Sequence, residues 1–223
     1  GRNIMKKLIG INLVFAAMVF AKYDVYGGTG FFVNSEYLVT AYHVVDGYEN
    51  ICYYDIKNGP CIKAHVVDYT VDSDVALLKL DEEPVEMPMV CRLAHGELPI
   101  GERLLSYGYP DPINDTSLTV IPLSIRMQYR YDGNYSFYRM TGTLQNGMSG
   151  GPNFTRDGRI GGMSKSIIVE ENTSNVVKST ELVRILRKNG VTEYPNTKNV
   201  KKCVISILSS DSEFKSARQK WGY

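Results

Sequence analysis

The segment from Asn146 to Pro152 places a single serine, Ser149, between glycines with a proline behind them. Glycine adopts backbone conformations that other residues avoid and lets another stretch of chain approach closely. Proline cannot donate a hydrogen bond within a central strand. We therefore predict a tight loop that presents the Ser149 hydroxyl outward, with the N–H groups of Gly147 and Ser149 free to hold an oxygen anion. The alternative is a Gly/Ser surface turn, because a nucleophilic serine also needs a base and an acid.

Three histidines are available as the base, and His43 differs from the others in its position. It closely follows the predicted buried strand Tyr37–Thr40, which places it at a strand end. His65 lies in an alternating strand and His95 lies in a connector, so both are most simply surface or structural imidazoles. His43 is therefore the candidate base, provided that an acid and a serine reach it.

Asp74 is the candidate acid, because it immediately precedes the apolar run Val75–Leu80. A carboxylate in this position is drawn toward the core and must find a hydrogen-bond donor there. The Nδ1–H group of His43 would be such a donor. Asp72, in the same turn-forming sequence, is the competing acid, and an ordinary turn is the alternative interpretation.

The composition predicts a folded, β-rich protein. With 223 residues, of which 43% are apolar and 22% charged, the chain is long enough to bury a substantial core. Sixteen tyrosines and twenty glycines favour strands joined by many turns. The net charge of +1, without blocks of like charge, does not indicate nucleic acid as a partner. No cysteine spacing resembles a metal-binding motif, so we expect neither a metal nor another cofactor.

The first residues have the pattern of a secretory signal. Lys6 and Lys7 precede an almost wholly apolar run over residues 8–21, which ends Val19-Phe20-Ala21. This run is short for a bilayer but suits a signal peptide over residues 1–21. We therefore expect a secreted or periplasmic protein without stable membrane association after removal of the signal. A buried first element or an uncleaved anchor is the alternative.

Export would permit disulfides, and the four cysteines form an even set. Cys52 and Cys61 flank a predicted turn and are therefore the preferred pair. Cys91 and Cys203 would then form a second, long-range pair. Four cysteines allow three pairings, so this assignment stays a preference.

Short predicted strands fall into two blocks, separated by a proline-containing connector over residues 81–101. A capped helix is predicted from Ser179 to Gly190, and residues 191–223 are predicted to form a tail with one strand, Cys203–Leu208. This order favours two β-barrels. The other strands are expected at Phe31–Val33, Tyr37–Thr40, Tyr48–Ile56, Cys61–Tyr69, Val75–Leu80, Arg103–Tyr107, Ser117–Ile125, Met127–Tyr131, Tyr135–Thr141 and Arg159–Val169.

Three motifs occur in the order His, Asp, Ser: Thr40-Ala41-Tyr42-His43, Asp74-Val75-Ala76-Leu77-Leu78 and Gly147-Met148-Ser149-Gly150-Gly151-Pro152. Together they resemble the catalytic motifs of chymotrypsin-like serine proteases, and most closely the bacterial high-temperature-requirement proteases and glutamyl endopeptidases. The resemblance runs from about Gly27 to Gly190. It includes Gly28-Thr29-Gly30-Phe31, Ile100-Gly101-Glu102-Arg103 and Tyr107-Gly108-Tyr109-Pro110.

The resemblance implies an all-β fold of two six-stranded antiparallel barrels with a short C-terminal helix and tail. Residues 22–95 would form the barrel with His43 and Asp74, residues 96–190 the barrel with Ser149, and residues 191–223 the tail. Ser149 would attack the carbonyl of a protein or peptide substrate, His43 would transfer the proton, and Asp74 would fix the imidazole tautomer. The N–H groups of Gly147 and Ser149 would form the oxyanion hole.

By position relative to Ser149, the resemblance places five residues at the primary specificity pocket. Thr143 and Leu144 would lie near its base, and Met163, Ser164 and Lys165 in its wall. No aspartate is present to attract a basic side chain, and Met163 replaces the histidine of glutamyl endopeptidases. Lys165 could attract an acidic side chain, although a solvated lysine is the alternative. We expect a small or medium apolar residue at the cleaved position.

Met148 stands where animal trypsins have the aspartate that pairs with a newly formed N-terminal amine, so activation by that salt bridge is not expected. Two further functions stay open. The chain could be a catalytically silent relative that binds peptides, or a protease domain released from a longer, for example viral, precursor. The sequence does not indicate the oligomeric state or the natural substrate.

Overall fold

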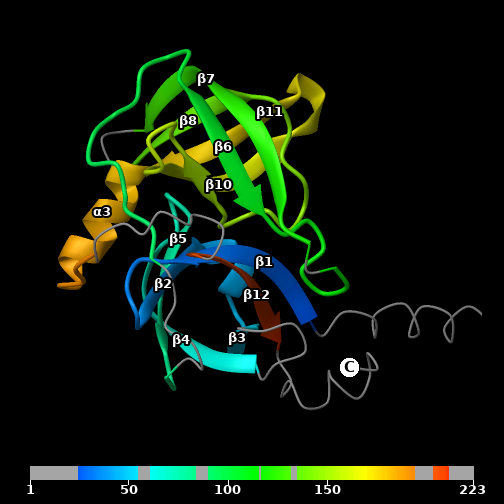
Figure 1. The fold of residues 1–223 in the computed structure, drawn as a ribbon, viewed down its shortest axis with the longest axis vertical. Coiled ribbons are helices and arrows are strands. Elements are labelled where there is room, and N and C mark those ends of the chain that lie inside the picture. The colour runs from blue at the N-terminus through cyan, green and yellow to red at the C-terminus, as the bar shows by residue number, and fades with distance from the viewer. Residues whose placement is uncertain are drawn as a thin grey trace, which may run out of the picture.

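The computed structural model describes residues 25–54, 61–83, 90–115, 117–131, 135–193 and 203–210, which form two closed antiparallel β-barrels (Figure 1). The first barrel contains, in sheet order, β1 (Val25–Phe32), β12 (Val204–Ser210), β3 (Asn50–Tyr54), β4 (Cys61–Thr70), β5 (Val75–Leu80) and β2 (Tyr37–Ala41). The second contains β10 (Ile160–Ile168), β11 (Thr173–Lys178), β8 (Tyr135–Thr141), β7 (Thr119–Tyr131), β6 (Arg103–Gly108) and β9 (Pro152–Phe154). The predicted fold of two six-stranded barrels is confirmed.

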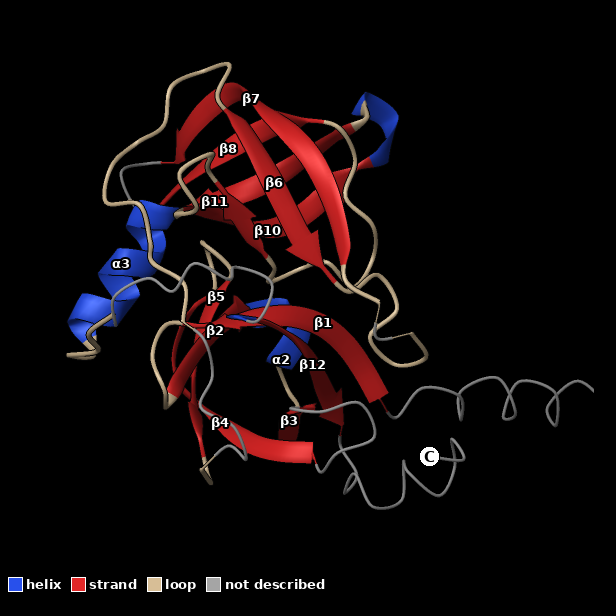
Figure 2. Cartoon of the chain, in the orientation of Figure 1, coloured by secondary structure: helices blue, strands red, loops and turns tan. Residues whose placement is uncertain are grey.

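The helical elements in the described residues lie outside the two sheets, and α2 (Tyr42–Val45) lies against the strands of the first barrel (Figure 2). This single turn follows β2, and a 3-10 turn, η1 (Val169–Glu171), joins β10 to β11. The longer helix α3 (Ser179–Lys188) follows β11. No helix in the described ranges is long and apolar enough to cross a membrane, and the predicted signal peptide lies outside those ranges.

The second barrel differs from the predicted strands in three places. The two strands expected around Arg126 are one long strand, β7, in which a register shift between Ile125 and Met127 produces a bend instead of a break. The short strand β9 and the strand β11 were not predicted. β9 begins at Pro152, a position that tolerates the missing N–H because it is the first residue of the strand.

The C-terminal strand belongs to the first barrel, so the predicted boundary that assigned residues 191–223 to a tail needs correction. β12 pairs antiparallel with β1 on one side and with β3 on the other, and all seven of its residues are buried. Gly30 of β1 makes this approach possible, since a Cβ there would collide with the Ile207 side chain and lie 3.0 Å from the Val39 carbonyl oxygen. The first barrel is therefore closed by a strand from the opposite end of the chain.

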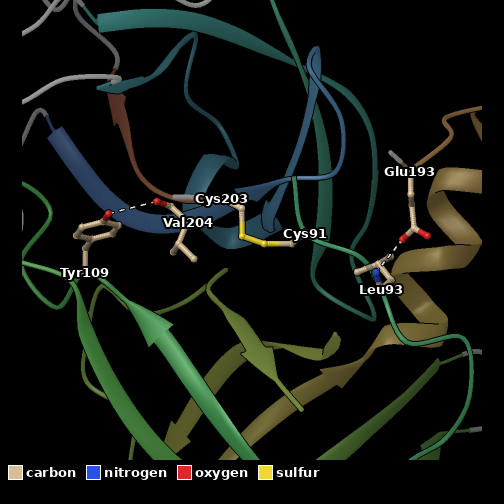
Figure 3. Close-up of a disulfide and its surroundings, with 6 residues drawn as sticks. All are labelled: Cys91, Leu93, Tyr109, Glu193, Cys203 and Val204. Carbon is tan, nitrogen blue, oxygen red and sulfur yellow. Dashed lines mark hydrogen bonds between the residues drawn. A yellow bond between two sulfur atoms is a disulfide. The ribbon is translucent and has the colours of Figure 1, made fainter. Parts of the chain in front are cut away.

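Both preferred disulfide pairings are present. Cys52–Cys61 joins β3 to β4 with a Cα–Cα distance of 5.6 Å. Cys91–Cys203 joins the connector between the barrels to the start of β12, with a Cα–Cα distance of 5.9 Å (Figure 3). Beside this bond, the Tyr109 hydroxyl donates to the Val204 carbonyl over 3.2 Å. β12 is thus fixed at its first residues both covalently and by the loop that follows β6.

Helix α3 attaches the second barrel to the first. Its buried face contains Leu182, Ile185 and Leu186, which belong to the larger apolar core. At its C-terminal end, Asp68 of β4 accepts hydrogen bonds from Lys188 Nζ at 3.2 Å and Asn189 Nδ2 at 2.7 Å. These donors hold the pKa of Asp68 below its ordinary value of 3.8, with Lys188 the larger cause.

We predict that replacing Cys91 and Cys203 together by serine destabilises the fold more than replacing Cys52 and Cys61. The bonds close loops with sequence separations of 112 and 9 residues, and the chain-entropy relation gives roughly 5 and roughly 3 kcal/mol. Urea unfolding of both double variants measures the difference. Equal losses would contradict the view that the long-range bond restrains β12.

We further predict that the Asp68→Asn variant is less stable than the parent at pH 7, by up to about 1 kcal/mol for this partly exposed pair. A depressed folded-state pKa stabilises the fold above the ordinary pKa of 3.8, and this stability is lost as the pH falls through the folded-state value. Unfolding of both proteins from pH 7 to pH 2 should therefore show a difference that shrinks in acid. A constant difference would contradict an ionic contribution.

Candidate active site

His43 and Asp74 meet because the strands next to them in the sequence are neighbours in the sheet. Ala41 at the end of β2 pairs with Val75 at the start of β5, so the residues that flank the two strands lie at the same edge. His43 Nδ1 lies 2.7 Å from Asp74 Oδ2, and the His43 backbone N–H donates to Asp74 Oδ1 over 2.9 Å. The Asp74 side chain is 10% exposed and that of His43 40%. One carboxylate therefore holds both the backbone and the ring of the histidine.

The turn before β5 gives Asp74 an unusual backbone conformation. Its φ of 59° lies in the left-handed region, which aspartate adopts more readily than most residues. The Asp74 N–H donates to the Val71 carbonyl over 3.1 Å, while its own carbonyl accepts from Tyr42 N–H over 3.1 Å. Backbone strain of this kind persists where the surroundings determine the conformation, and it is found preferentially at functional sites.

The Ser149 loop lies against the edge of the first barrel that carries His43. Gly147 and Gly150 have φ values of 84° and 87°, as expected for a tight glycine loop. A Cβ on Gly150 would collide with the Thr29 carbonyl and the Thr40 hydroxyl, and would lie 2.8 Å from the Ala41 nitrogen. The loop backbone therefore packs directly on β1 and β2, and Ala41 is only two residues from His43.

Thr29 of β1 holds this loop, and sequence reasoning did not identify it as a site residue. Its backbone N–H donates to the Ser149 carbonyl over 2.9 Å, and its hydroxyl donates to the Gly147 carbonyl over 2.8 Å. The same hydroxyl accepts from Tyr109 N–H over 2.9 Å, and Thr29 is fully buried. The motif Gly28-Thr29-Gly30 contained the signal, since a hydroxyl between two glycines can approach other backbone closely.

The structure brings His43 and Asp74 into direct contact but leaves Ser149 bonded elsewhere. Ser149 is half-buried, and its hydroxyl donates to the Lys165 carbonyl over 3.3 Å. No hydrogen bond links Ser149 to His43 among the described residues. Hydrogen bonds of this type are often long or misaligned in ligand-free proteins and tighten when a substrate binds.

The N–H groups of Gly147 and Ser149 in the loop have no acceptor within the described part of the chain. Met148 N–H donates to the Gln145 carbonyl and Gly150 N–H to the Ser164 carbonyl. The N–H groups of Gly147 and Ser149 make no such bond. Donors held in a rigid loop beside a serine hydroxyl can stabilise a developing oxyanion without further reorganisation.

The five residues predicted for the specificity pocket differ in accessibility. The side chains of Leu144, Met163 and Ser164 are buried, and Ser164 Oγ bonds to Ser106 Oγ over 3.0 Å. These three residues would reach a substrate only through backbone atoms. Thr143 is partly exposed and its hydroxyl bonds to Asn172, while Lys165 extends away to the first barrel.

Tyr42, the residue before His43, forms an aromatic pair with Tyr69. The rings of Tyr42 and Tyr69 stack with centroids 4.3 Å apart and planes 3° from parallel. The Tyr42 hydroxyl donates to Asp46 Oδ1 over 2.7 Å, and this bond raises the pKa of Tyr42 well above its usual range. Nowhere in the described ranges do three or more His, Cys, Asp or Glu side chains form a group that could hold a metal ion.

Comparisons with known proteins show which family this chain resembles. The family model described as Trypsin-like peptidase domain matches residues 28–163. The periplasmic serine endoprotease DegP-like protein of Halomonas elongata is 28% identical over 141 residues, which are 63% of this chain and 29% of that protein. Serine protease Rv3671c of Mycobacterium tuberculosis is 28% identical over 177 residues, 74% of this chain and 43% of that protein.

A solved structure shares the architecture. The crystal structure of the Rv3671c protease in its active form superposes with a TM-score of 0.63 at 26% identity, covering 78% of both chains. The present chain spans less than half the length of the two curated relatives named above.

We predict that Thr29→Val destabilises the fold by roughly 2–4 kcal/mol, because the change removes one hydroxyl and leaves the Tyr109 N–H and the Gly147 carbonyl without it. A buried polar group that loses its partner costs about 1–3 kcal/mol. Urea unfolding measures the loss. Thr29→Ser, which keeps the hydroxyl, is the matched control and should recover most of the stability; equal stability of Thr29→Val and the parent would contradict the assigned bonds.

Proposed function

Because this chain belongs to the trypsin-like peptidase family, we propose that it is a serine endopeptidase with Ser149 as nucleophile, His43 as general base and Asp74 as the acid that orients it. The observation that carries the proposal is a pair of hydrogen bonds. The Asp74 carboxylate accepts one from the backbone N–H of His43 and one from its Nδ1. A carboxylate on Nδ1–H leaves the lone pair of the neutral imidazole on Nε2. That tautomer is the one a general base requires.

The reaction follows from this arrangement. On substrate binding, the Ser149 hydroxyl turns from the Lys165 carbonyl to His43 Nε2, which takes its proton as Oγ attacks the peptide carbonyl. The N–H groups of Gly147 and Ser149 hold the resulting oxyanion, and loss of such a donor typically costs about 10²–10³ in kcat. His43 then protonates the departing amine. A water molecule, activated by the same imidazole, hydrolyses the acyl-enzyme.

Activation through a salt bridge beside the nucleophile is not part of this proposal. The residue before Ser149 is Met148, which is fully buried in the second-barrel core together with Leu144 and Tyr138. An apolar side chain in that environment cannot pair with an N-terminal amine. The loop is instead held by Thr29 and by the Gly150 N–H bond to Ser164.

A small or medium apolar side chain is the proposed preference at the cleaved position. Thr143, at the base of the proposed pocket, is neutral and bonded to Asn172. The Lys165 ammonium donates to the Asp72 carbonyl over 3.1 Å instead of turning toward the pocket. No charge from these residues is therefore directed at the substrate side chain.

The proposal also includes the substrates and the location. We expect protein or peptide substrates and a secreted or periplasmic protein. The signal-like residues 1–21 support the location. The Halomonas elongata relative, whose name describes it as periplasmic, also supports it. Reaction through an acyl-enzyme on Ser149 needs only side chains and backbone amides of this chain.

We predict that a fluorophosphonate probe labels the purified protein and that Ser149→Ala and His43→Ala abolish labelling. Asp74→Asn should slow labelling by about 10⁴-fold, since the imidazole loses its tautomer and orientation. The matched control is His65→Ala, because His65 forms an exposed pair with Asp81 in the same barrel and should not affect labelling. If the probe does not label the folded parent protein, the result contradicts the proposal and favours a peptide-binding role.

A further inference from the structure

Lys165 occupies a β-bulge at the centre of the candidate active site. In the pairing of β10 with β11, Ser164 lies opposite Val176 and Ser166 opposite Asn175, so the strand register shifts at Lys165. The extra residue of a bulge is re-aimed relative to an ordinary ladder, and bulges are enriched beside active sites. Here the bulge directs the two ends of Lys165 toward different parts of the site.

The backbone end contacts the nucleophile and the side-chain end contacts the other barrel. The Lys165 carbonyl accepts the hydrogen bond of Ser149 Oγ at 3.3 Å. Its ammonium donates to the carbonyl oxygen of Asp72 over 3.1 Å, although the two residues are 93 positions apart. One residue of the second barrel therefore connects the Ser149 hydroxyl with the turn that carries Asp74.

That turn determines where the Asp74 carboxylate points. Asp72 lies two residues before Asp74, inside the turn closed by the bond from Asp74 N–H to the Val71 carbonyl. The hydroxyls of Thr70 and Ser73 bond to each other within the same turn. Because Asp74 is held at a positive φ, a rotation of the turn would move its carboxylate away from His43. The Lys165 ammonium restrains the turn from the barrel that carries the nucleophile.

We propose that Lys165 is a positioning residue, which holds the Asp74 turn in register with the Ser149 loop across the two barrels. The inference rests on the proposed serine-protease function. In this proposal, the Lys165 ammonium binds the Asp72 carbonyl and does not bind an acidic side chain of the substrate. Lys165 acts through Asp72 and Asp74, so its removal should affect turnover and leave substrate affinity largely intact.

The test compares Lys165→Met, which keeps the side-chain length but removes the donors, with Lys165→Arg, which retains donors. Lys63→Met is the control, since Lys63 is an exposed lysine on β4. We expect kcat of Lys165→Met on a peptide substrate to fall about 10–100-fold, because a misplacement of about 1 Å can cost about 10²-fold. KM should change less than about threefold, and Lys165→Arg should recover most of the loss, at similar melting temperatures.

Three kinetic outcomes would overturn the inference: parent-like kcat in Lys165→Met, an increase confined to KM, or an arginine variant as impaired as the methionine variant. A second readout does not depend on activity. The low-field proton NMR signal of His43 Nδ1–H, assigned with His43→Ala and His65→Ala, should shift or broaden in Lys165→Met and not in Lys63→Met. If the parent resists the fluorophosphonate probe, the proposed function fails, while an unchanged NMR signal in Lys165→Met would overturn the positioning role separately.

Discussion

The site depends on a close approach of backbone to backbone where the two barrels meet. Gly150 lies against the Thr29 carbonyl, the Thr40 hydroxyl and the Ala41 nitrogen, where no side-chain carbon would fit. This contact places the Ser149 loop on the strand end that carries His43. Interiors at this packing density transmit small displacements instead of absorbing them, so the glycine, and not a flexible side chain, determines how the Ser149 loop lies on the first barrel.

Around this contact, hydrogen bonds between the two barrels hold the loop that contains Ser149 and the turn that contains Asp74. The buried Thr29 hydroxyl accepts from Tyr109 N–H and donates to the Gly147 carbonyl. Lys165 makes the corresponding link on the side of the acid, from the bulge in β10 to the turn before β5. His43 and Asp74, the proposed base and acid, lie next to the ends of two neighbouring strands of one sheet. Their pairing is thus a property of the first barrel, whereas the approach of Ser149 is a property of both.

The first barrel in turn depends on a strand from the far end of the chain. β12 lies between β1 and β3 and supports the strand that contains Thr29. The Cys91–Cys203 bond and the contact between Tyr109 and Val204 fix its first residues (Figure 3). Closing a barrel removes exposed strand edges, so the late strand completes both the fold and the support of the site.

The sequence by itself indicated the all-β class and the two barrels, because these follow from local alternation and turn residues. It left the two disulfide pairs as a preference among three pairings, and it offered His43 and Asp74 as candidates without showing that they meet; the structure brings them into contact. It did not indicate that β12 joins the first barrel, that Thr29 holds the Ser149 loop, or that Lys165 extends to Asp72. It also predicted Met163 and Ser164 in a pocket wall, and it could not indicate that their side chains are buried. Such features depend on which segments pack together across the barrels. Periodicity reports the face that a strand buries, but only the tertiary structure decides what that face contacts.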